Sequence, residues 1–442
     1  MRQFAGPLLA AIVVMFAPAQ LAADALSDAV ARDYEERLEA LFRHLHANPE
    51  LSHREFETAA RLAKEFRALG YTVTEGIGGT GVAAVLANGP GPTVMLRADM
   101  DGLPIEEQTG LPWASTVRQT GIDGVEQPVM HACGHDVHMT ALVGAAARLA
   151  ADRSAWSGTL LLVAQPAEER LSGAAAMLAD GLYERVPKPD YALAFHVSSS
   201  RPAGELQIRP GIAWSSMDNV DIVVRGVGGH GASPHLAIDP VMVASQIVIT
   251  IQSSISRGIS PLQPVVVTVG SIRGGTKHNV ISDRVDLQMT VRSNDPETRW
   301  RVLEIIDEVA DGVARSFGVP DDKLPEVRRS ATESTPPTIN DEGTAARLRA
   351  AFRAHFGEDR LVATPRTGMG AEDFARFIEP GLGVRGVYFH VGGAPTAELP
   401  VAPHHHSPHF MIEPEPAIRT GTEAFVVSAL TLMPPATGTA AR

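Results

Sequence analysis

The single cysteine of this 442-residue chain lies in the segment Met130–His138, which reads Met-His-Ala-Cys-Gly-His-Asp-Val-His. Cys133 and His135 stand two residues apart, with His131 and His138 on either side. One cysteine cannot form an internal disulfide, so a cross-linking role is excluded. An isolated cysteine is usually a small buried hydrophobe, but a thiolate among several imidazoles is a donor set suited to a divalent transition metal. The segment therefore predicts a metal site.

Further donors follow two apolar runs that are typical of buried strands. Residues 158–164 precede Glu168 and Glu169, and residues 191–195 precede His196. The ends of parallel strands meet at one edge of a sheet, which is where α/β folds bind their ligands. Because adjacent carboxylates after a strand point in different directions, one can bind metal while the other moves protons. A third cluster near the C-terminus contains His404, His405, His406 and His409.

Each of these signals has an ordinary explanation when it is taken alone. Paired glutamates are commonly a solvated turn, a histidine such as His196 is also consistent with a hydrogen-bonded core position, and a triple histidine is often a surface loop. Their conjunction in one chain favours the metal site.

The composition limits the class of protein. About 440 residues are enough for two domains, and the apolar fraction of 44% is that of a soluble globular protein. The formal net charge of −13 argues against a nucleic-acid partner, because phosphate binding needs a basic surface.

The N-terminus is typical of a secretory signal peptide. Arg2 is followed by the apolar run 8–16 and the alanine-rich stretch 17–25. We expect cleavage near Ala23 and export to the periplasm or the medium. The apolar run is too short for a stable membrane span. The alternative is an apolar N-terminal helix that belongs to the fold.

The periodicity predicts a large α/β domain that is split by a smaller one. Helical spacing over residues 27–46 and 56–69 precedes alternating strands and helices up to residue 197, which indicates a mostly parallel sheet. The pattern changes near Trp214 to βαββα, an α+β unit with an antiparallel sheet. We expect a signal peptide at residues 1–23 and a catalytic domain in two pieces, 24–212 and 326–442. A lid domain at residues 213–325 lies between the two pieces, and residues 320–337 form the return linker.

At this level of detail the chain resembles the M20 metallopeptidase family, and within it the amidohydrolase branch that acts on N-acyl amino acids, hippurate and auxin conjugates. The resemblance covers everything beyond the leader and is carried by the motifs at residues 46–52, 97–105, 131–138, 165–169, 226–235, 274–281, 369–374 and 406–408.

The resemblance implies a set of metal ligands and a catalytic base. The implied ligands of two adjacent divalent ions are Cys133, His135, Glu169, His196 and His406. His405 and His409 are close rivals of His406, which is preferred because a small residue and proline follow it. Asp99 holds the place where other branches carry a histidine ligand. Ligand type alone leaves zinc, manganese and cobalt open.

The remaining roles are also implied by the resemblance. Glu168 would be the general base, and Asp101 would orient a metal-bound group, although a turn residue before Gly102 is the alternative for Asp101. In the lid, His230 would stabilise the oxyanion, with a cap on a glycine-rich turn as the alternative. Asn279 and Arg292 would bind the substrate carboxylate. The chain departs from the family at Ser282, usually proline, and at Gly102, where alanine is common.

The predicted function is a metal-dependent amidohydrolase that cleaves the amide bond of a small N-acyl amino acid or a related conjugate. A dipeptidase or exopeptidase of the same superfamily is the alternative within enzymes, and a non-catalytic binding protein on this fold is the alternative outside them. The family also implies a homodimer formed through the lid domain.

Overall fold

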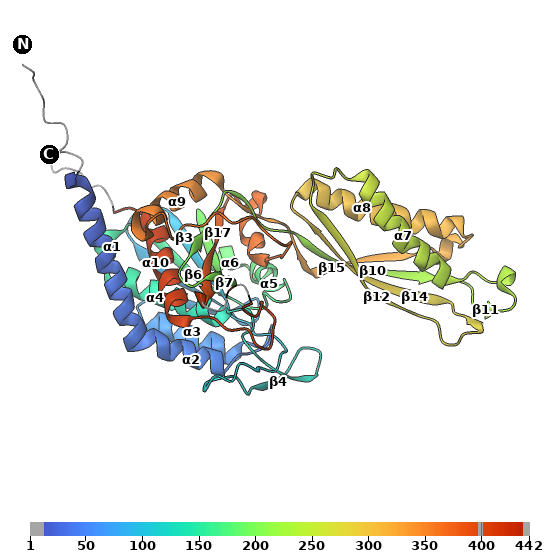
Figure 1. Cartoon of the computed structure of the whole chain (residues 1–442), viewed down its shortest axis with the longest axis horizontal. Coiled ribbons are helices and arrows are strands. Elements are labelled where there is room, and N and C mark those ends of the chain that lie inside the picture. Colours follow the sequence, from blue (N-terminus) through green and yellow to red (C-terminus); the bar gives the residue numbers. More distant parts are fainter. Residues whose placement is uncertain (1–12, 397–398, 400, 436–442) are drawn as a thin grey trace, which may run out of the picture. The chain divides into compact units, whose positions relative to one another are not determined.

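The computed structural model describes residues 13–396, 399 and 401–435, which form two compact units (Figure 1). The first unit contains the residues up to Ala213, the segment Ile339–Pro365 and the residues from Phe377 onward. The second unit contains Trp214–Thr338 and the short segment Arg366–Arg376.

The first unit is built on a seven-stranded sheet with the strand order β1-β2-β6-β3-β7-β17-β8. The strands are β1 (Thr72–Ile77), β2 (Gly81–Asn88), β3 (Thr93–Asp99), β6 (Gly158–Gln165), β7 (Tyr191–Pro202), β8 (Leu206–Gln207) and β17 (Arg385–Ala394). The four central strands run parallel, and the outer pairings are antiparallel. The predicted α/β class with a mostly parallel sheet is confirmed.

Helices enclose this sheet and complete its apolar core. They are α1 (Val13–Asp33), a π-helical turn (Tyr34–Leu38), α2 (Glu39–Ala47), α3 (Phe56–Ala68), α4 (His135–Ala151), α5 (Gly173–Ala179), α6 (Leu182–Arg185), α9 (Glu342–Phe356) and α10 (Pro414–Leu432). Helices α4 and α10 pack closely because glycines replace side chains at their contact. A Cβ on Gly144 would lie 2.7 Å from Thr422 Oγ1, and one on Gly421 would lie 3.2 Å from the Ala141 Cβ. The buried α4 therefore places its N-terminus firmly at the sheet edge.

The second unit is a four-stranded antiparallel sheet, in the order β12-β14-β10-β15, with two long helices. Its elements are β10 (Met217–Arg225), β11 (Gly229–His230), α7 (Pro240–Gly258), β12 (Val265–Gly274), β13 (Val280–Ile281), β14 (Arg284–Ser293), α8 (Pro296–Ser316) and β15 (Glu326–Thr335).

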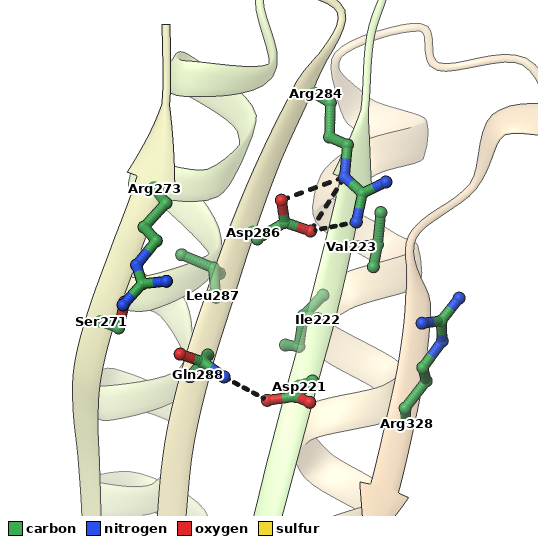
Figure 2. Close-up of a pocket in the computed structure, with 10 residues that line it drawn as sticks. All are labelled: Asp221, Ile222, Val223, Ser271, Arg273, Arg284, Asp286, Leu287, Gln288 and Arg328. Atoms are coloured by element: carbon green, nitrogen blue, oxygen red, sulfur yellow. Dashed lines mark hydrogen bonds and ion pairs between the residues drawn. The ribbon is translucent and has the colours of Figure 1, made fainter. Parts of the chain in front are cut away.

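Strand alternation separates the two faces of this second sheet. Val220, Ile222 and Val224 of β10 are buried in a core shared with α7 and α8. Asp221, between them, faces the other way, where polar side chains such as Arg284 and Asp286 line a pocket (Figure 2). There Arg284 Nη2 donates to Asp286 Oδ1 at 2.7 Å. The face without helices is thus a solvated, charge-paired surface.

The predicted return linker is wrong, because most of residues 320–337 form a strand of this sheet. β15 pairs with β10, so the main segment of the second unit continues to Thr338 rather than ending at residue 325. As an edge strand, β15 has one sheet partner and carries exposed arginines such as Arg328. Charged edge strands protect a sheet from further pairing, and this polar pattern made the strand look like a linker in the sequence.

The N-terminal region also differs from expectation. The predicted helix 27–46 is three consecutive elements, of which α1 begins at Val13. From Ala23 onward α1 packs on the first unit, with Val30 fully buried and Ser27 Oγ donating to Glu423 Oε2 at 2.7 Å. Residues 1–12, at the start of the predicted signal peptide, lie outside the described residues. Within the described part of the chain, no helix has the length and apolar character needed to cross a membrane.

Shorter elements complete the chain. They are the hairpin β4 (Arg118–Thr120) and β5 (Glu126–Pro128), the pair β9 (Gly211–Trp214) and β16 (Thr338–Asn340), and several 3-10 turns.

Candidate metal centre

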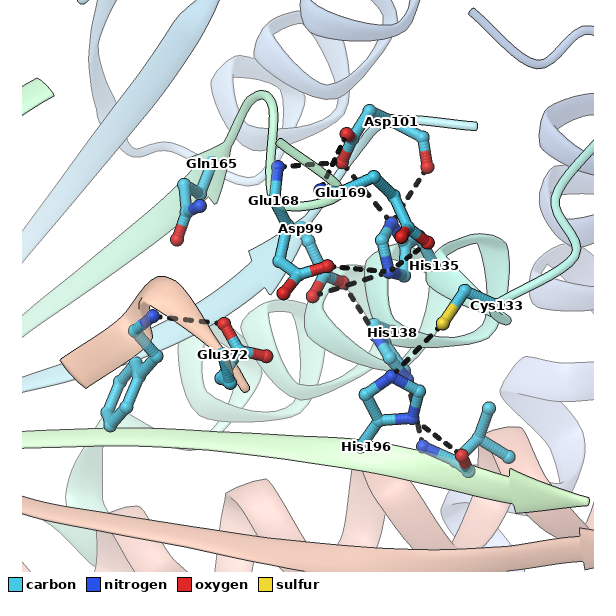
Figure 3. A network of polar contacts seen from close by, with 12 residues as sticks. Asp99, Asp101, Cys133, His135, His138, Gln165, Glu168, Glu169, His196 and Glu372 are labelled. Carbon is cyan, nitrogen blue, oxygen red and sulfur yellow. Dashed lines mark hydrogen bonds and ion pairs between the residues drawn. The ribbon is translucent and has the colours of Figure 1, made fainter. Parts of the chain in front are cut away.

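The first unit brings the predicted donors together at one edge of its sheet. Strand β6 ends at Gln165 and leads into the turn of Glu168 and Glu169, while His135 begins α4. His196 lies within β7 rather than at its end, because β7 continues to Pro202. Figure 3 shows these side chains converging from different elements.

His135 and the two glutamates form the centre of the cluster. His135 Nε2 lies 3.8 Å from Glu168 Oε2 and 3.9 Å from Glu169 Oε1. Its other nitrogen, Nδ1, lies 2.7 Å from the carbonyl oxygen of Asp101, which accepts a hydrogen bond from it. Since Nδ1 bonds this carbonyl, Nε2 is the ring nitrogen that faces the carboxylates.

Cys133 and His196 form the second half of the cluster. The Cys133 Sγ lies 3.4 Å from Nε2 of His196 (Figure 3). His196 Nδ1 donates to the carbonyl oxygen of Val197 at 2.7 Å, so Nε2 is the nitrogen that faces Cys133. Burial holds the pKa of His196 well below its usual value, which keeps the ring neutral. Both histidines thus bind a backbone carbonyl through Nδ1 and direct Nε2 toward the cluster, which is the orientation of a metal ligand.

His406 is the C-terminal histidine that joins this cluster. Its Nε2 lies 3.4 Å from Glu169 Oε2, and together with Cys133 these groups can approach one ion. His405 Nε2 instead accepts the backbone N–H of Ser199 at 3.3 Å, and His409 Nδ1 lies 3.0 Å from the carbonyl oxygen of Gln108. The geometry therefore favours His406 over its two rivals.

Asp101 orients the glutamate turn. Its Oδ1 accepts the N–H of Glu168 and its Oδ2 accepts the N–H of Glu169, each at 3.1 Å. Ser52 Oγ also donates to Oδ2 at 2.6 Å. Both carboxylate oxygens of Asp101 thus accept hydrogen bonds from the turn, and its carbonyl accepts one from His135. Such contacts are typical of a carboxylate that supports metal ligands.

Asp99, His138, Arg97 and Gln165 form a buried layer behind the donors. Asp99 Oδ2 accepts from Arg97 at 2.7 Å, and its Oδ1 lies 2.6 Å from His138 Nδ1. Arg97 also donates to Gln165 Oε1 at 2.8 Å. Sequence reasoning assigned no role to Arg97, Gln165 or His138. An arginine inside the apolar run of β3 was the signal that could have revealed this layer.

The electrostatics of the cluster call for a cation. Burial, followed by the carboxylates of Glu169 and Glu168, raises the pKa of the Cys133 thiol well above its usual value. Burial also raises the pKa of Glu169 to about 7. His135 Nε2 and Glu169 Oε1 are buried without a hydrogen-bond partner among the described residues. Because unsatisfied buried polar atoms are costly, these donors fit divalent metal.

The predicted lid residues belong to the second unit. His230 is exposed on β11, and its Nδ1 accepts the backbone N–H of Ala232 at 3.0 Å. The neighbouring strand brings Asn279 beside it, since the Asn279 carbonyl accepts the N–H of Gly231 at 2.9 Å. Arg292 lies on a different strand, β14, and donates to the carbonyl oxygen of Met369 at 2.8 Å. The structure therefore groups His230 with Asn279, but not with Arg292.

The sequence matches the profile of Peptidase family M20/M25/M40 over residues 95–430. The chain belongs to this family. The match spans most of the described chain and includes all the donors described above, so the predicted family resemblance is confirmed.

Relatives of this M20 protein are hydrolases of amide bonds by name. Hippurate hydrolase of Campylobacter jejuni is 36% identical over 348 residues, covering 78% of this chain and 86% of the relative. Thermostable carboxypeptidase 2 of Saccharolobus solfataricus is 34% identical over 403 residues, covering 90% and 96%.

A solved structure has the same fold. The Bacillus subtilis YXEP protein, described as a dinuclear metal binding peptidase from the M20 family, superposes with a TM-score of 0.74 at 29% identity. The similarity covers 91% of this chain and 99% of that one.

Proposed function

We propose that this M20 protein is a metal-dependent amidohydrolase that cleaves the amide bond of an N-acyl amino acid. The observation that carries the proposal is a pair of buried atoms without a hydrogen-bond partner among the described residues, His135 Nε2 and Glu169 Oε1, which lie 3.9 Å apart beside a second carboxylate. The names of the relatives support the same chemistry.

The proposed ligands of two divalent ions are Cys133, His135, Glu169, His196 and His406. When bound, such ions polarise the amide carbonyl and make water more acidic. The mixed sulfur, nitrogen and oxygen set suits zinc, manganese or cobalt. A metal ion would also lower the pKa of the Cys133 thiol, so the thiolate needed for ligation would form.

Glu168 is the proposed general base. Its carboxylate is buried and lies next to the donors, with Oε2 3.8 Å from His135 Nε2. It takes one proton from the attacking water as the C–O bond forms, and it returns that proton to the leaving nitrogen as the C–N bond breaks. The products are a carboxylic acid and a free amino acid. Asp101 holds the backbone of Glu168 in place through this cycle.

The roles of the lid residues are proposed from the family resemblance and not from the geometry of the metal-ligand cluster. His230 would donate to the developing oxyanion through Nε2, since Nδ1 accepts from Ala232. Asn279 and Arg292 would bind the carboxylate of the substrate. The protein would form a homodimer through the second unit.

Export is a further part of the proposal, based on the N-terminal sequence alone. Intact-mass measurement of the periplasmic or secreted protein should give an N-terminus near Asp24. An intact Met1 in the cytosolic fraction would contradict it.

A substrate panel tests the proposed activity. Apo-protein is supplied separately with zinc, manganese and cobalt and is assayed on N-acetyl, N-benzoyl and long-chain N-acyl amino acids beside free dipeptides. Hydrolysis of acyl amino acids in preference to dipeptides supports the amidohydrolase. The name of the carboxypeptidase relative favours the exopeptidase as the second candidate, and preferential cleavage of dipeptides would establish it. Metal binding without hydrolysis of any member would favour a binding protein.

A further inference from the structure

The turn that carries Glu168 and Glu169 begins with a residue in an unusual conformation. Ala167 has a φ of 50°, in the left-handed region that residues other than glycine rarely adopt. Its N–H donates to Oε1 of Glu55 at 2.8 Å, from a segment more than a hundred residues earlier in the chain. Such a conformation persists only where the surroundings enforce it.

Glu55 is placed to enforce the conformation of Ala167. Its side chain is fully buried, and the same Oε1 accepts the N–H of His53 at 2.9 Å, while Oε2 accepts from Thr80 Oγ1 at 2.6 Å. His53 is itself left-handed, with a φ of 62°. Its ring Nε2 lies 2.9 Å from Ser172 Oγ, at the far end of the glutamate turn. One short segment therefore holds both ends of that turn.

The helix that follows Glu55 does not need its carboxylate. Glu55 precedes α3 but makes no side-chain cap. Glu50 performs that task, accepting the N–H groups of Glu57 at 3.2 Å and Thr58 at 2.8 Å. Burying a carboxylate is costly unless its hydrogen bonds are satisfied, and those of Glu55 are directed to the turns at His53 and Ala167 instead.

Three successive N–H groups of the turn are thus bound by two buried carboxylates. Glu55 takes the N–H of Ala167, and Asp101 takes those of Glu168 and Glu169. We propose that Glu55 is a positioning residue that holds Ala167 in the left-handed conformation. This conformation directs the side chain of Glu168 to the position of the base and that of Glu169 to the position of the metal ligand. This inference rests on the proposed function of that pair.

The test compares two buried glutamates of the same segment. Glu55→Gln keeps the size but places an amide N–H₂ among donors, whereas Glu50→Gln weakens only the cap of α3. Measurements are made above about pH 8, because burial and then Asp101 raise the pKa of Glu55 to about 7.

Three readouts separate positioning from general destabilisation. In Glu55→Gln, hydrogen exchange should rise in the peptide of residues 166–172, metal affinity by chelator competition should fall about 10–100-fold, and kcat should fall by a similar factor with little change in KM. In Glu50→Gln, exchange should rise at the start of α3, while metal affinity and kcat stay near the original values.

A second substitution tests the role of the backbone conformation. Glycine adopts a positive φ readily, so Ala167→Gly should restore part of the lost metal affinity when it is added to Glu55→Gln. Ala167→Gly alone is the reference for this comparison.

Three outcomes would each overturn the proposal. Glu55→Gln could leave hydrogen exchange and metal affinity unchanged, Glu50→Gln could lose as much metal affinity and kcat as Glu55→Gln, or the double variant could show no recovery of metal affinity. Exchange and metal affinity need no substrate. If the protein hydrolysed no substrate of the panel, the proposed amidohydrolase activity would be wrong. Hydrogen exchange and metal affinity would still show whether Glu55 positions the turn.

Discussion

Cys133 Sγ and His196 Nε2 face each other at 3.4 Å, although 63 residues separate them in the sequence. A thiolate sulfur and an imidazole nitrogen are both ligands that zinc-like divalent ions prefer, so this pair can bind one ion together.

The Cys133→Ser variant should therefore bind at least one metal ion fewer than the original protein. A hydroxyl is a much weaker ligand for soft divalent ions than a thiolate. Metal analysis of the purified variant by mass spectrometry checks this, with the exposed Ser253→Ala as a control. Full metal content together with full activity would remove Cys133 from the ligand set.

Glu168 and Glu169 should fail in different ways. Glu168→Gln is expected to keep the metal and the fold but to lower kcat by several orders of magnitude, because an amide cannot take up the proton. Glu169→Gln should lose metal first. Metal content and single-turnover rates measured side by side distinguish them, and the opposite pattern would mean that the two roles are exchanged.

His230→Ala should lower kcat strongly while metal content stays unchanged. An oxyanion donor acts mainly in the transition state, and the loss of one typically costs about 10²–10³ in kcat. Mixing this variant with Glu168→Gln subunits then tests a shared dimer site. If His230 acts across a dimer, one site of the mixed dimer is intact and activity partly returns. No recovery, with subunit exchange shown by mass, would place its action within one chain or outside catalysis.

His46 should make stability depend on pH in the alkaline range. Burial lowers its pKa, but hydrogen bonds to Asp136 at 2.7 Å and Glu107 at 3.1 Å outweigh burial and raise the pKa to about 10. A raised folded-state pKa stabilises the protein fully below the unfolded value of about 6.5, and this contribution is lost as pH rises toward about 10.

Urea unfolding of the metal-loaded protein at a series of pH values measures this slope. Between about pH 6.5 and 10 the free energy of unfolding should fall by a few kcal/mol, on the scale of about 1.4 kcal/mol per pKa unit. His46→Gln should flatten the slope, whereas His44→Gln, on the same helix, should leave it intact. Identical slopes in all three proteins would exclude His46 as the source.

Local sequence determined the ligand types and much of the secondary structure. Cys133 and His135 could be predicted as donors from their spacing among other histidines, and Glu169 and His196 because each follows an apolar run of the sheet. Alternation likewise predicted the core face of β10, since its period of two is a local property of the chain. The sequence did not predict β15, because a polar edge strand lacks the apolar alternation by which strands are recognised.

Only the tertiary structure decided which histidine of the C-terminal cluster joins the donors and what holds the glutamate turn. The family pattern favoured His406 over His405 and His409 in the sequence, but their neighbours Glu169, Ser199 and Gln108 come from distant segments. Nothing in the sequence singled out Glu55, because its partner Ala167 lies 112 residues away. Sequence patterns record which residues are apolar or polar along one element, whereas these hydrogen bonds depend on how separate elements pack.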